Sequence, residues 1–125
     1  MKNAEANVAL HALQELAGLA LPVAGAMKVR RIMRAVAAQA EDVEAERMKL
    51  IRAHAMRGDD DQVAPDEHGN AQFASDEDQD AFMAALSELM AATWEPEARL
   101  AAADLGERVE VRPAVLVALG ELLED

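Results

Sequence analysis

The clearest pattern in this sequence is a row of apolar positions that alternates steps of three and four residues. The row consists of Ala26, Val29, Met33, Val36, Ala40, Val43, Arg47, Leu50 and His54, with only the arginine and the histidine polar. This heptad-like spacing places all nine positions on one face of an α-helix. We therefore predict one long helix over 22–57, about 54 Å at 1.5 Å per residue. A compact domain of this size is only about 36 Å across, so the helix must bend, be lined by two shorter helices, or be covered by a second subunit.

A shorter helical pattern occupies residues 4–20. Its apolar positions, three and four residues apart, are Val8, Ala12 or Leu13, Leu16, and Leu19 or Ala20. Gly18 and Pro22 then interrupt the pattern, as is typical of one helix ending and another beginning. Together the two patterns predict a helical hairpin in which helix 4–20 covers part of the long helix.

A third helix is predicted over 76–93. Ser75, with Asp78 three residues later, resembles a capping box, and Asp76, Glu77 and Asp78 suit the positive end of a helix dipole. The apolar face of this helix consists of Phe82, Met83, Leu86, Leu89 and Met90. It is the second candidate cover for the long helix.

The last third of the chain mixes patterns. The stretch "WEPEARLAAADL" contains Pro96 and fits either an edge strand or an irregular helix, while "RVEVR" alternates and predicts a short strand. Pro113 opens a last helix, which Gly120 weakens but need not end. Its apolar face is predicted to hold Val115, Leu116, Leu119, Leu122 and Leu123. The predicted fold class is therefore mainly α (α+β), with a small β element in the C-terminal half.

The length of 125 residues fits a single domain over 1–125 that can bury a core without disulfides or metals. We divide it into a helical part at 1–57, an acidic loop at 58–75, and a part at 76–125 that holds the third helix, the small β element and the last helix. The loop begins "GDDDQVAPDEHGN", in which Gly69 and Asn70 suit a small turn or hairpin. We interpret it as a solvated connector.

Composition excludes several kinds of chemistry. The chain has no cysteine, which rules out thiol catalysis, zinc ribbons and disulfides, and it has only three aromatic residues. Its only hydroxyl residues are Ser75, Ser87 and Thr93, and no nucleophile motif or glycine-rich phosphate loop surrounds them. The start of the chain does not read as a signal peptide, and no run of about eighteen apolar residues could span a membrane. We predict no catalytic site, no cofactor and no enzymatic activity.

Metal binding is also not predicted. Asp76, Asp78 and Asp80 have the spacing that begins a calcium loop, but Ala81 and Ser87 stand where the loop requires glycine and glutamate. Asp59, Asp60 and Asp61 lack such spacing. The isolated residues His11, His54 and His68 form no metal-ligand motif, and the neighbours Glu67 and His68 are read as solvated rather than as an acid–base pair.

The charge of the chain is unevenly distributed. Residues 1–57 carry nine Lys/Arg and six Asp/Glu, or +3, whereas residues 58–125 carry three and eighteen, or −15. Broad binding of nucleic acid is disfavoured, because phosphate contacts come mainly from Lys and Arg. The acidic half could instead imitate the phosphates of a nucleic acid, although its charge also suits simple solubility.

The early part of the long helix carries a basic cluster. The stretch "KVRRIMR" contains Lys28, Arg30, Arg31 and Arg34. Arg30 and Arg34 are four residues apart and Lys28 and Arg31 are three apart, so these residues flank the apolar row. The cluster is either a solvated face or a contact for an acidic surface, on the same chain or on a neighbour. The predicted interaction surface comprises Lys28, Val29, Arg30, Arg31, Ile32, Met33, Arg34, Val36, Val43 and Met48.

Further apolar residues, Met27, Ile32, Met48 and Ile51, lie off the main row of the long helix. Apolar residues on two sides of one helix suggest a second buried surface, and a symmetric pair of helices is a common solution. We therefore expect a homo-oligomer.

Taken in order, several stretches resemble a family of short tailed-phage and prophage proteins. The matching stretches are "LQELAGLALPV" at 13–23, "EAERMKLI" at 44–51, "DEHGNAQF" at 66–73 and "RPAVLVALGELLED" at 112–125. This chain departs from the pattern in being rich in alanine and arginine, and in having Arg112 where a serine cap is expected. The resemblance implies a phage origin and brings no catalytic residue with it.

These observations lead to three functional hypotheses. The first is a non-enzymatic phage protein that acts by protein–protein contact, in the virion or during its assembly, and is found in the host cytoplasm or the virion. The second is an acidic phage inhibitor of a host enzyme or defence system, which could act as a nucleic-acid mimic. The third, a small enzyme or nucleotide-sequestering protein, has no motif in its favour.

Overall fold

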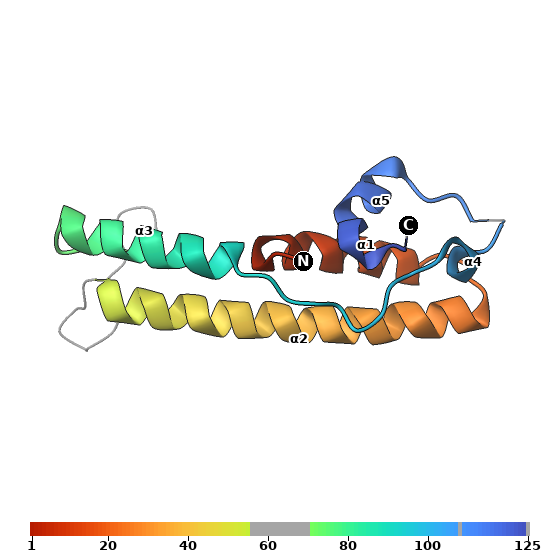
Figure 1. Cartoon of the computed structure of the whole chain (residues 1–125), viewed down its shortest axis with the longest axis horizontal. Coiled ribbons are helices and arrows are strands. Elements are labelled where there is room, and N and C mark those ends of the chain that lie inside the picture. The colour runs from red at the N-terminus through yellow and green to blue at the C-terminus, as the bar shows by residue number, and fades with distance from the viewer. Residues whose placement is uncertain (56–70, 108, 125) are drawn as a thin grey trace. The chain divides into compact units, whose positions relative to one another are not determined.

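The structure, a computed structural model, describes residues 1–55, 71–107 and 109–124 and is mainly helical, as predicted (Figure 1). Its α-helices are α1 (Ala6–Ala17), α2 (Val23–His54), α3 (Asp76–Ala91), α4 (Ala102–Leu105) and α5 (Pro113–Leu119). Single 3₁₀ turns at Asn3–Glu5 and Gly120–Leu122 precede α1 and follow α5. The chain divides into two compact units, Met1–Glu41 with Thr93–Asp125, and Asp42–Ala92. The expectation of a single domain over 1–125 stays a prediction.

The small β element expected from "RVEVR" is not present in the part of the chain that the structure describes. Residues 109–112 connect α4 to α5 without pairing as a strand, and Arg108 lies outside the described residues. Isolated bridges instead pair Lys2 with Thr93 and Leu100 with Leu123. Alternating apolar and polar residues form a strand only where a second extended segment lies alongside. Residues 109–112 have no such segment among the described residues.

The core of the first unit is built on one face of α1. Ala6, Ala9, Leu13 and Leu16 follow one another at steps of three and four residues and are almost fully buried. The sequence-based expectation of Val8 on this face was wrong by one position, because Val8 is 55 % exposed and Ala9 is buried in its place. Alanine at two of these positions lets neighbouring helices approach α1 closely.

The rest of this core comes from parts of the chain far apart in sequence. Buried residues that join the α1 face are Met1, Ala12, Val29, Ile32, Val36, Leu100, Val115, Leu119 and Leu122. In Figure 1, α1 lies along the first half of α2, and α5 packs over α1. Arg112 also ties α5 to α1, because its Nε and Nη2 donate to the Glu15 carboxylate at 2.7 Å each and lower the pKa of Glu15. Arg112, which stands where the resemblance would have a serine cap, therefore links α5 to α1 through Glu15.

The stretch "WEPEARLAAADL", for which strand and helix were both open, is extended as far as residue 101 and then forms the single turn of α4. Three backbone hydrogen bonds attach it to both ends of the chain. Trp94 N–H donates to the Met1 carbonyl at 2.8 Å, Leu100 N–H donates to Leu122 at 2.6 Å, and Glu124 N–H donates to Leu100 at 2.8 Å. The side chains alternate, with Trp94, Pro96, Ala98 and Leu100 turned towards the core and Glu95, Glu97 and Arg99 exposed.

Helix α4 lies directly against the start of α2. A Cβ added to Gly25 would stand 1.7 Å from the carbonyl oxygen of Asp104, so this contact requires glycine. The Asp104 carboxylate accepts hydrogen bonds from the Ala101 N–H at 2.8 Å and from Lys28 Nζ at 3.0 Å. These two donors lower the pKa of Asp104, with the Ala101 N–H contributing most.

The last helix is shorter than the sequence indicated. Helix α5 ends at Leu119, because Gly120 adopts φ +48° and ψ −116° and the chain continues as a 3₁₀ turn. The sequence left open whether Gly120 ends the helix, and in the structure it does. Glycine reaches such a backbone conformation readily, whereas other residues do not.

The second unit contains the last part of α2 and all of α3, which run in opposite directions beside each other (Figure 1). Val43 and Phe82 are each 8 % exposed, and the Phe73 and Phe82 rings lie 5.1 Å apart. The cap predicted for α3 is confirmed, since the Ser75 side chain accepts a hydrogen bond from the Asp78 N–H at 3.2 Å. Met83 was expected on the apolar face but is 51 % exposed.

Candidate functional site

The apolar members of the predicted interaction surface lie mostly inside the protein. Val29, Ile32 and Val36 are at most 4 % exposed in the core of the first unit, and Val43 is buried in the second. Met33 and Met48 are half-buried. The row of three- and four-residue steps is therefore correct as the buried side of α2, and every position in it is buried or half-buried. These valines and Ile32 are not accessible to a partner in this structure.

The basic members of that surface divide into two groups. Lys28 is half-buried and pairs with Asp104, so one contact with an acidic residue from the other end of the chain is already made. Arg30, Arg31 and Arg34 are exposed, and within the described residues no carboxylate forms an ion pair with any of them. Arg34 Nε only makes a long hydrogen bond, 3.5 Å, to the Arg30 carbonyl.

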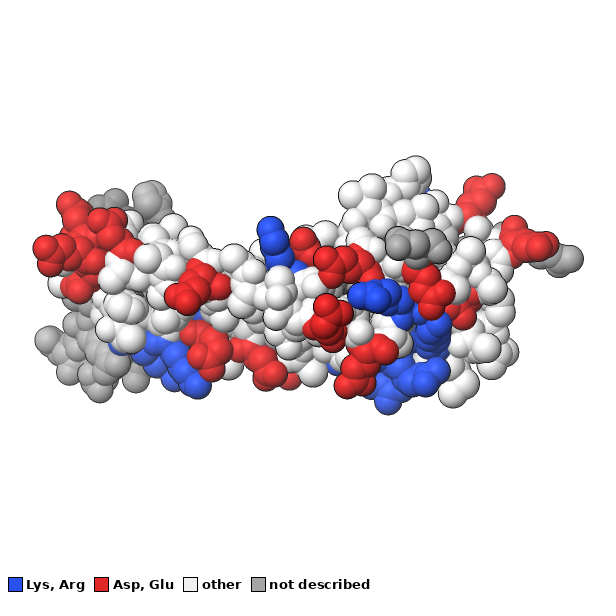
Figure 2. All heavy atoms as spheres, viewed as in Figure 1, with Lys and Arg blue, Asp and Glu red and all other residues white. Residues whose placement is uncertain are grey.

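The three arginines lie on one stretch of α2, where Arg34 is four residues from Arg30 and three from Arg31 and is a neighbour of both on the helix surface. Figure 2 shows lysine and arginine side chains gathered over this part of the molecule, with acidic side chains close by. We call Arg30, Arg31 and Arg34 the arginine cluster. Its guanidinium groups are planar donors that suit bidentate contacts with carboxylates.

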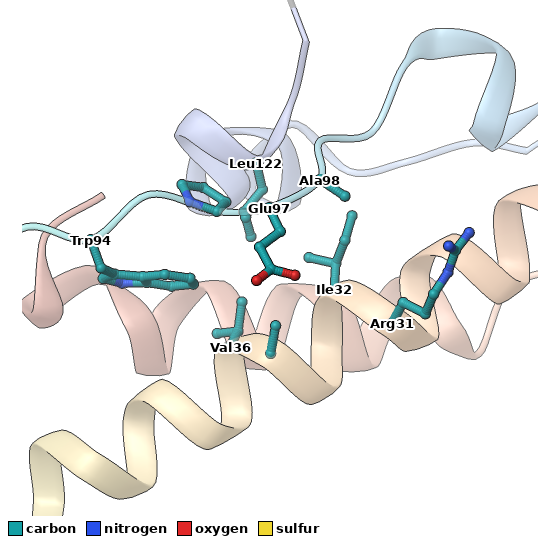
Figure 3. Close-up of a pocket in the computed structure, with 9 residues that line it drawn as sticks. Arg31, Ile32, Val36, Trp94, Glu97, Ala98 and Leu122 are labelled. Carbon is teal, nitrogen blue, oxygen red and sulfur yellow. The ribbon is translucent and has the colours of Figure 1, made fainter.

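A pocket of about 220 Å³ opens beside the arginine cluster (Figure 3). Its lining residues come from α2, from the extended segment and from the turn after α5, all within the first unit, and are Arg31, Ile32, Ala35, Val36, Trp94, Pro96, Glu97, Ala98 and Leu122. Most of the lining is apolar. Because Ile32, Val36 and Leu122 also belong to the rigid core, the floor of the pocket is held in place.

Besides Arg31, the pocket wall includes Trp94 and Glu97, each with a polar group that has no partner among the described residues. The indole Nε1 of Trp94 is buried and has no hydrogen-bond acceptor in the described part of the chain. The Glu97 carboxylate forms no ion pair with any described residue. In Figure 3 it lies between the Trp94 ring and Ile32, while the Arg31 guanidinium points away from it.

Sequence reasoning missed Trp94 and Glu97 as site residues. The signal was present in the alternation of Trp94, Pro96 and Ala98 with the charged residues between them, which is typical of an extended segment lying on a core. Proline at the centre of the stretch left both a strand and a helix open. Neither reading indicated that the segment would run beside the arginine cluster.

The metal-binding and acid–base candidates from the sequence form no site among the described residues. Residues 1–55, 71–107 and 109–124 contain no group of three or more His, Asp or Glu residues placed to hold a metal ion. Asp59, Asp60, Asp61, Glu67 and His68 lie outside the described residues. His11 and His54 lie on separate helices, exposed and half-buried respectively. No helix in the described part of the chain has both the length and the apolar character needed to cross a membrane.

Comparison with known proteins gives no relatives from which a function could be inferred. No protein-family model matches the chain, and the curated proteins and solved structures give no match either. The functional assignment therefore rests on the residues of this chain.

Proposed function

We propose that this chain is a non-enzymatic, phage-encoded protein that acts by contact with another protein, in the virion or during its assembly. The observation that carries the contact is the arginine cluster: three exposed guanidinium groups without an ion-pair partner among the described residues. The chain has 24 acidic and 12 basic residues, so unpaired arginines are notable in it. They leave directed hydrogen-bond donors for the carboxylates of a partner. The proposed phage origin is supported by the stretches that resemble tailed-phage proteins.

The proposal has consequences for where and with what the protein acts. The partner is a phage structural protein or a host protein with an acidic surface, met in the host cytoplasm or in the virion. Extended binding of nucleic acid is not part of the proposal, because the net charge of −12 would repel phosphates outside the arginine cluster. No cofactor and no catalytic step are proposed.

The alternative function, an acidic inhibitor of a host enzyme or defence system, is supported by a different observation. Asp76, Glu77 and Asp80 are exposed at the start of α3 and make no ion pair with another described residue. A structural role competes with this reading, because Ser75 caps α3 and the acidic first turn stabilises the positive end of the helix.

A pull-down from lysate of phage-infected host cells tests the leading proposal. The bait is the wild-type chain, compared with a variant carrying Arg30→Gln, Arg31→Gln and Arg34→Gln. The control carries Arg47→Gln, Lys49→Gln and Arg52→Gln, which removes three positive charges from the same helix in the second unit. We expect a phage structural protein or an acidic host protein to be captured by the wild type and the control, and lost with the arginine-cluster variant.

Two results would count against the proposal. Equal loss in both variants would show that the contact depends on overall charge and not on the arginine cluster. Capture of a DNA- or RNA-binding enzyme that is released by salt and does not need the three arginines would place the inhibitor function first.

A further inference from the structure

The pocket beside the arginine cluster has the size and chemistry of an anchor site for one side chain. Its volume of about 220 Å³ is smaller than the roughly 300–1,000 Å³ of pockets that hold whole small molecules. Its wall combines Trp94 and Arg31, two residue types that are enriched where single side chains contribute most of the binding energy of an interface. Ile32, Val36 and Leu122 would exclude water from an inserted apolar group.

The unpaired polar groups around the pocket are mostly hydrogen-bond donors. Arg31 lines the pocket and Arg34 follows it on the next turn of α2, and neither guanidinium group forms an ion pair with a described residue. A segment that fits this rim has an apolar side chain to insert and oxygen acceptors beside it. The arginine cluster would repel a basic segment and attract an acidic one.

Glu97 is the exception, because its carboxylate is an acceptor. It is exposed and forms no ion pair within the described residues, yet it lines the pocket and lies between the Trp94 ring and Ile32 in Figure 3. A carboxylate can therefore reach this position, and an incoming acidic segment would have to displace that of Glu97. Because Glu97 forms no ion pair with a described residue, its displacement breaks none there.

We propose that this pocket receives an apolar side chain from an acidic segment of the partner protein and that Arg31 and Arg34 bind the carboxylates beside that side chain. The Glu97 carboxylate competes with the carboxylates of the partner for the pocket. This inference rests on the proposed function and adds the chemistry of the bound segment. Glu97 thereby weakens the binding of every segment, and only a segment with both an apolar anchor and carboxylates displaces it. A segment with only one of these features would bind weakly.

The pocket contains its own reporter, because Trp94 is the only tryptophan in the chain. Titration of its fluorescence can follow three short synthetic peptides: an acidic peptide with one leucine, the same peptide with alanine instead, and a lysine-rich peptide with the leucine. We expect the acidic leucine peptide to bind and to shift the Trp94 emission. The alanine peptide should bind about tenfold more weakly, because it loses the buried methyl groups. Salt should weaken both.

Two single substitutions give effects of opposite sign. Arg31→Gln should weaken binding of the acidic leucine peptide several-fold, and Glu97→Gln should strengthen it several-fold. Both side chains are exposed, so neither change removes core packing, and circular dichroism checks that the helices remain. Lys49→Gln in the second unit is the matched control and should leave the affinity unchanged.

The outcomes separate this inference from the function on which it rests. Equal affinity for the leucine and alanine peptides, with Arg31→Gln still weakening both, would overturn the anchor pocket and leave the arginine contact standing. No salt-sensitive binding of either acidic peptide would count against the proposed function itself. Preference for the lysine-rich peptide, with weaker binding after Glu97→Gln, would show that the pocket takes a cationic side chain and would overturn the inference.

Discussion

At the scale of single residues, Gly25 is the described glycine at which an added Cβ would make the shortest contact. A Cβ at this position would lie 1.7 Å from the carbonyl oxygen of Asp104 and 2.7 Å from its carbonyl carbon. Both are backbone atoms, so the clash cannot be relieved by a side-chain rotation. The contact between α2 and α4 therefore depends on the absence of a side chain at this one residue.

Replacing Gly25→Ala should lower the free energy of unfolding by about 2 kcal/mol, in spite of the better helix propensity of alanine. Urea unfolding followed by circular dichroism measures this change. Gly18→Ala is the matched control, because the nearest atom to an added Cβ there is the Glu15 carbonyl oxygen at 3.5 Å. A Gly25→Ala variant as stable as the Gly18→Ala variant would show that α4 does not lie against α2 in solution.

Asp104 makes the same contact sensitive to pH. Its pKa is lowered in the folded chain by the Ala101 N–H first and by Lys28 second. A lowered pKa stabilises the fold fully above the ordinary carboxyl pKa, and the stabilisation is lost as the pH falls through the folded value. We expect Asp104→Asn to be less stable than the wild type at neutral pH. The difference should shrink at about pH 3, below the ordinary aspartate pKa of about 3.9.

The measurement is the free energy of unfolding of both proteins at the two pH values. Asp80→Asn serves as the control, because Asp80 is exposed and forms no ion pair with a described residue. A constant difference between wild type and Asp104→Asn at both pH values would mean that the aspartate acts through packing and not through its charge.

At the scale of elements, the parts that could be predicted are those with local causes. The start of α3 follows from Ser75 and the acidic residues after it, and the buried face of α2 follows from its spacing of three and four. Both signals lie within one helix and need no knowledge of the rest of the chain. The buried face of α1 shows where such local prediction fails. Ala9 is buried in place of Val8, because a small residue fits where the neighbouring helix comes close.

The extended segment that forms one wall of the pocket could not be predicted in the same way. Its backbone is held by hydrogen bonds to Met1, Leu122 and Glu124, residues distant from it in sequence. Local propensity is divided in this segment, because Pro96 disfavours the interior of a helix and the alanines after it favour a helix. Only half of the candidate site could therefore be predicted from the sequence. The arginine cluster is a local pattern on α2, whereas Trp94 and Glu97 come close to it only through the tertiary fold.

The end of α5 gives a test at this scale. Gly120 has φ +48° and ψ −116°, and nothing lies within 4 Å of an added Cβ. Gly120→Ala should therefore be destabilising by about 1–2 kcal/mol through backbone strain alone. If α5 instead continued as a regular helix in solution, the same substitution would be stabilising, since alanine is the better helix former. Thermal unfolding distinguishes the two signs.

At the scale of the whole molecule, burial changes which residues could mediate self-association. Ile32 is 4 % exposed and belongs to the core, so it cannot also form the interface for which the sequence suggested it. Val23 and Met27, four residues apart on α2, are 78 % and 61 % exposed. They are the large apolar residues of α2 that are exposed and remain available for a second copy.

Light scattering after gel filtration tests the expected homo-oligomer, at low and high salt and at tens of micromolar protein. We expect a mass above the 13.4 kDa of one chain, and Met27→Glu should return it to the monomer with its helices intact. Ile32→Glu should instead unfold the chain, because a buried charge costs roughly 4 kcal/mol or more. A monomeric wild type under both conditions would rule out self-association, and an oligomer unaffected by Met27→Glu would place the interface elsewhere.

The way in which the first unit is closed has a consequence for how the protein is made. Val29, Ile32 and Val36 leave the ribosome early, but Leu100, Val115, Leu119 and Leu122, which share their core, are synthesised many residues later. With chain elongation at roughly 5–20 residues per second, the part of this core that the later residues cover stays exposed for several seconds during translation, although α1 is already present. A stop codon before residue 113 would remove Val115, Leu119 and Leu122 and leave the core residues that they cover exposed permanently, and such a product should aggregate or be degraded.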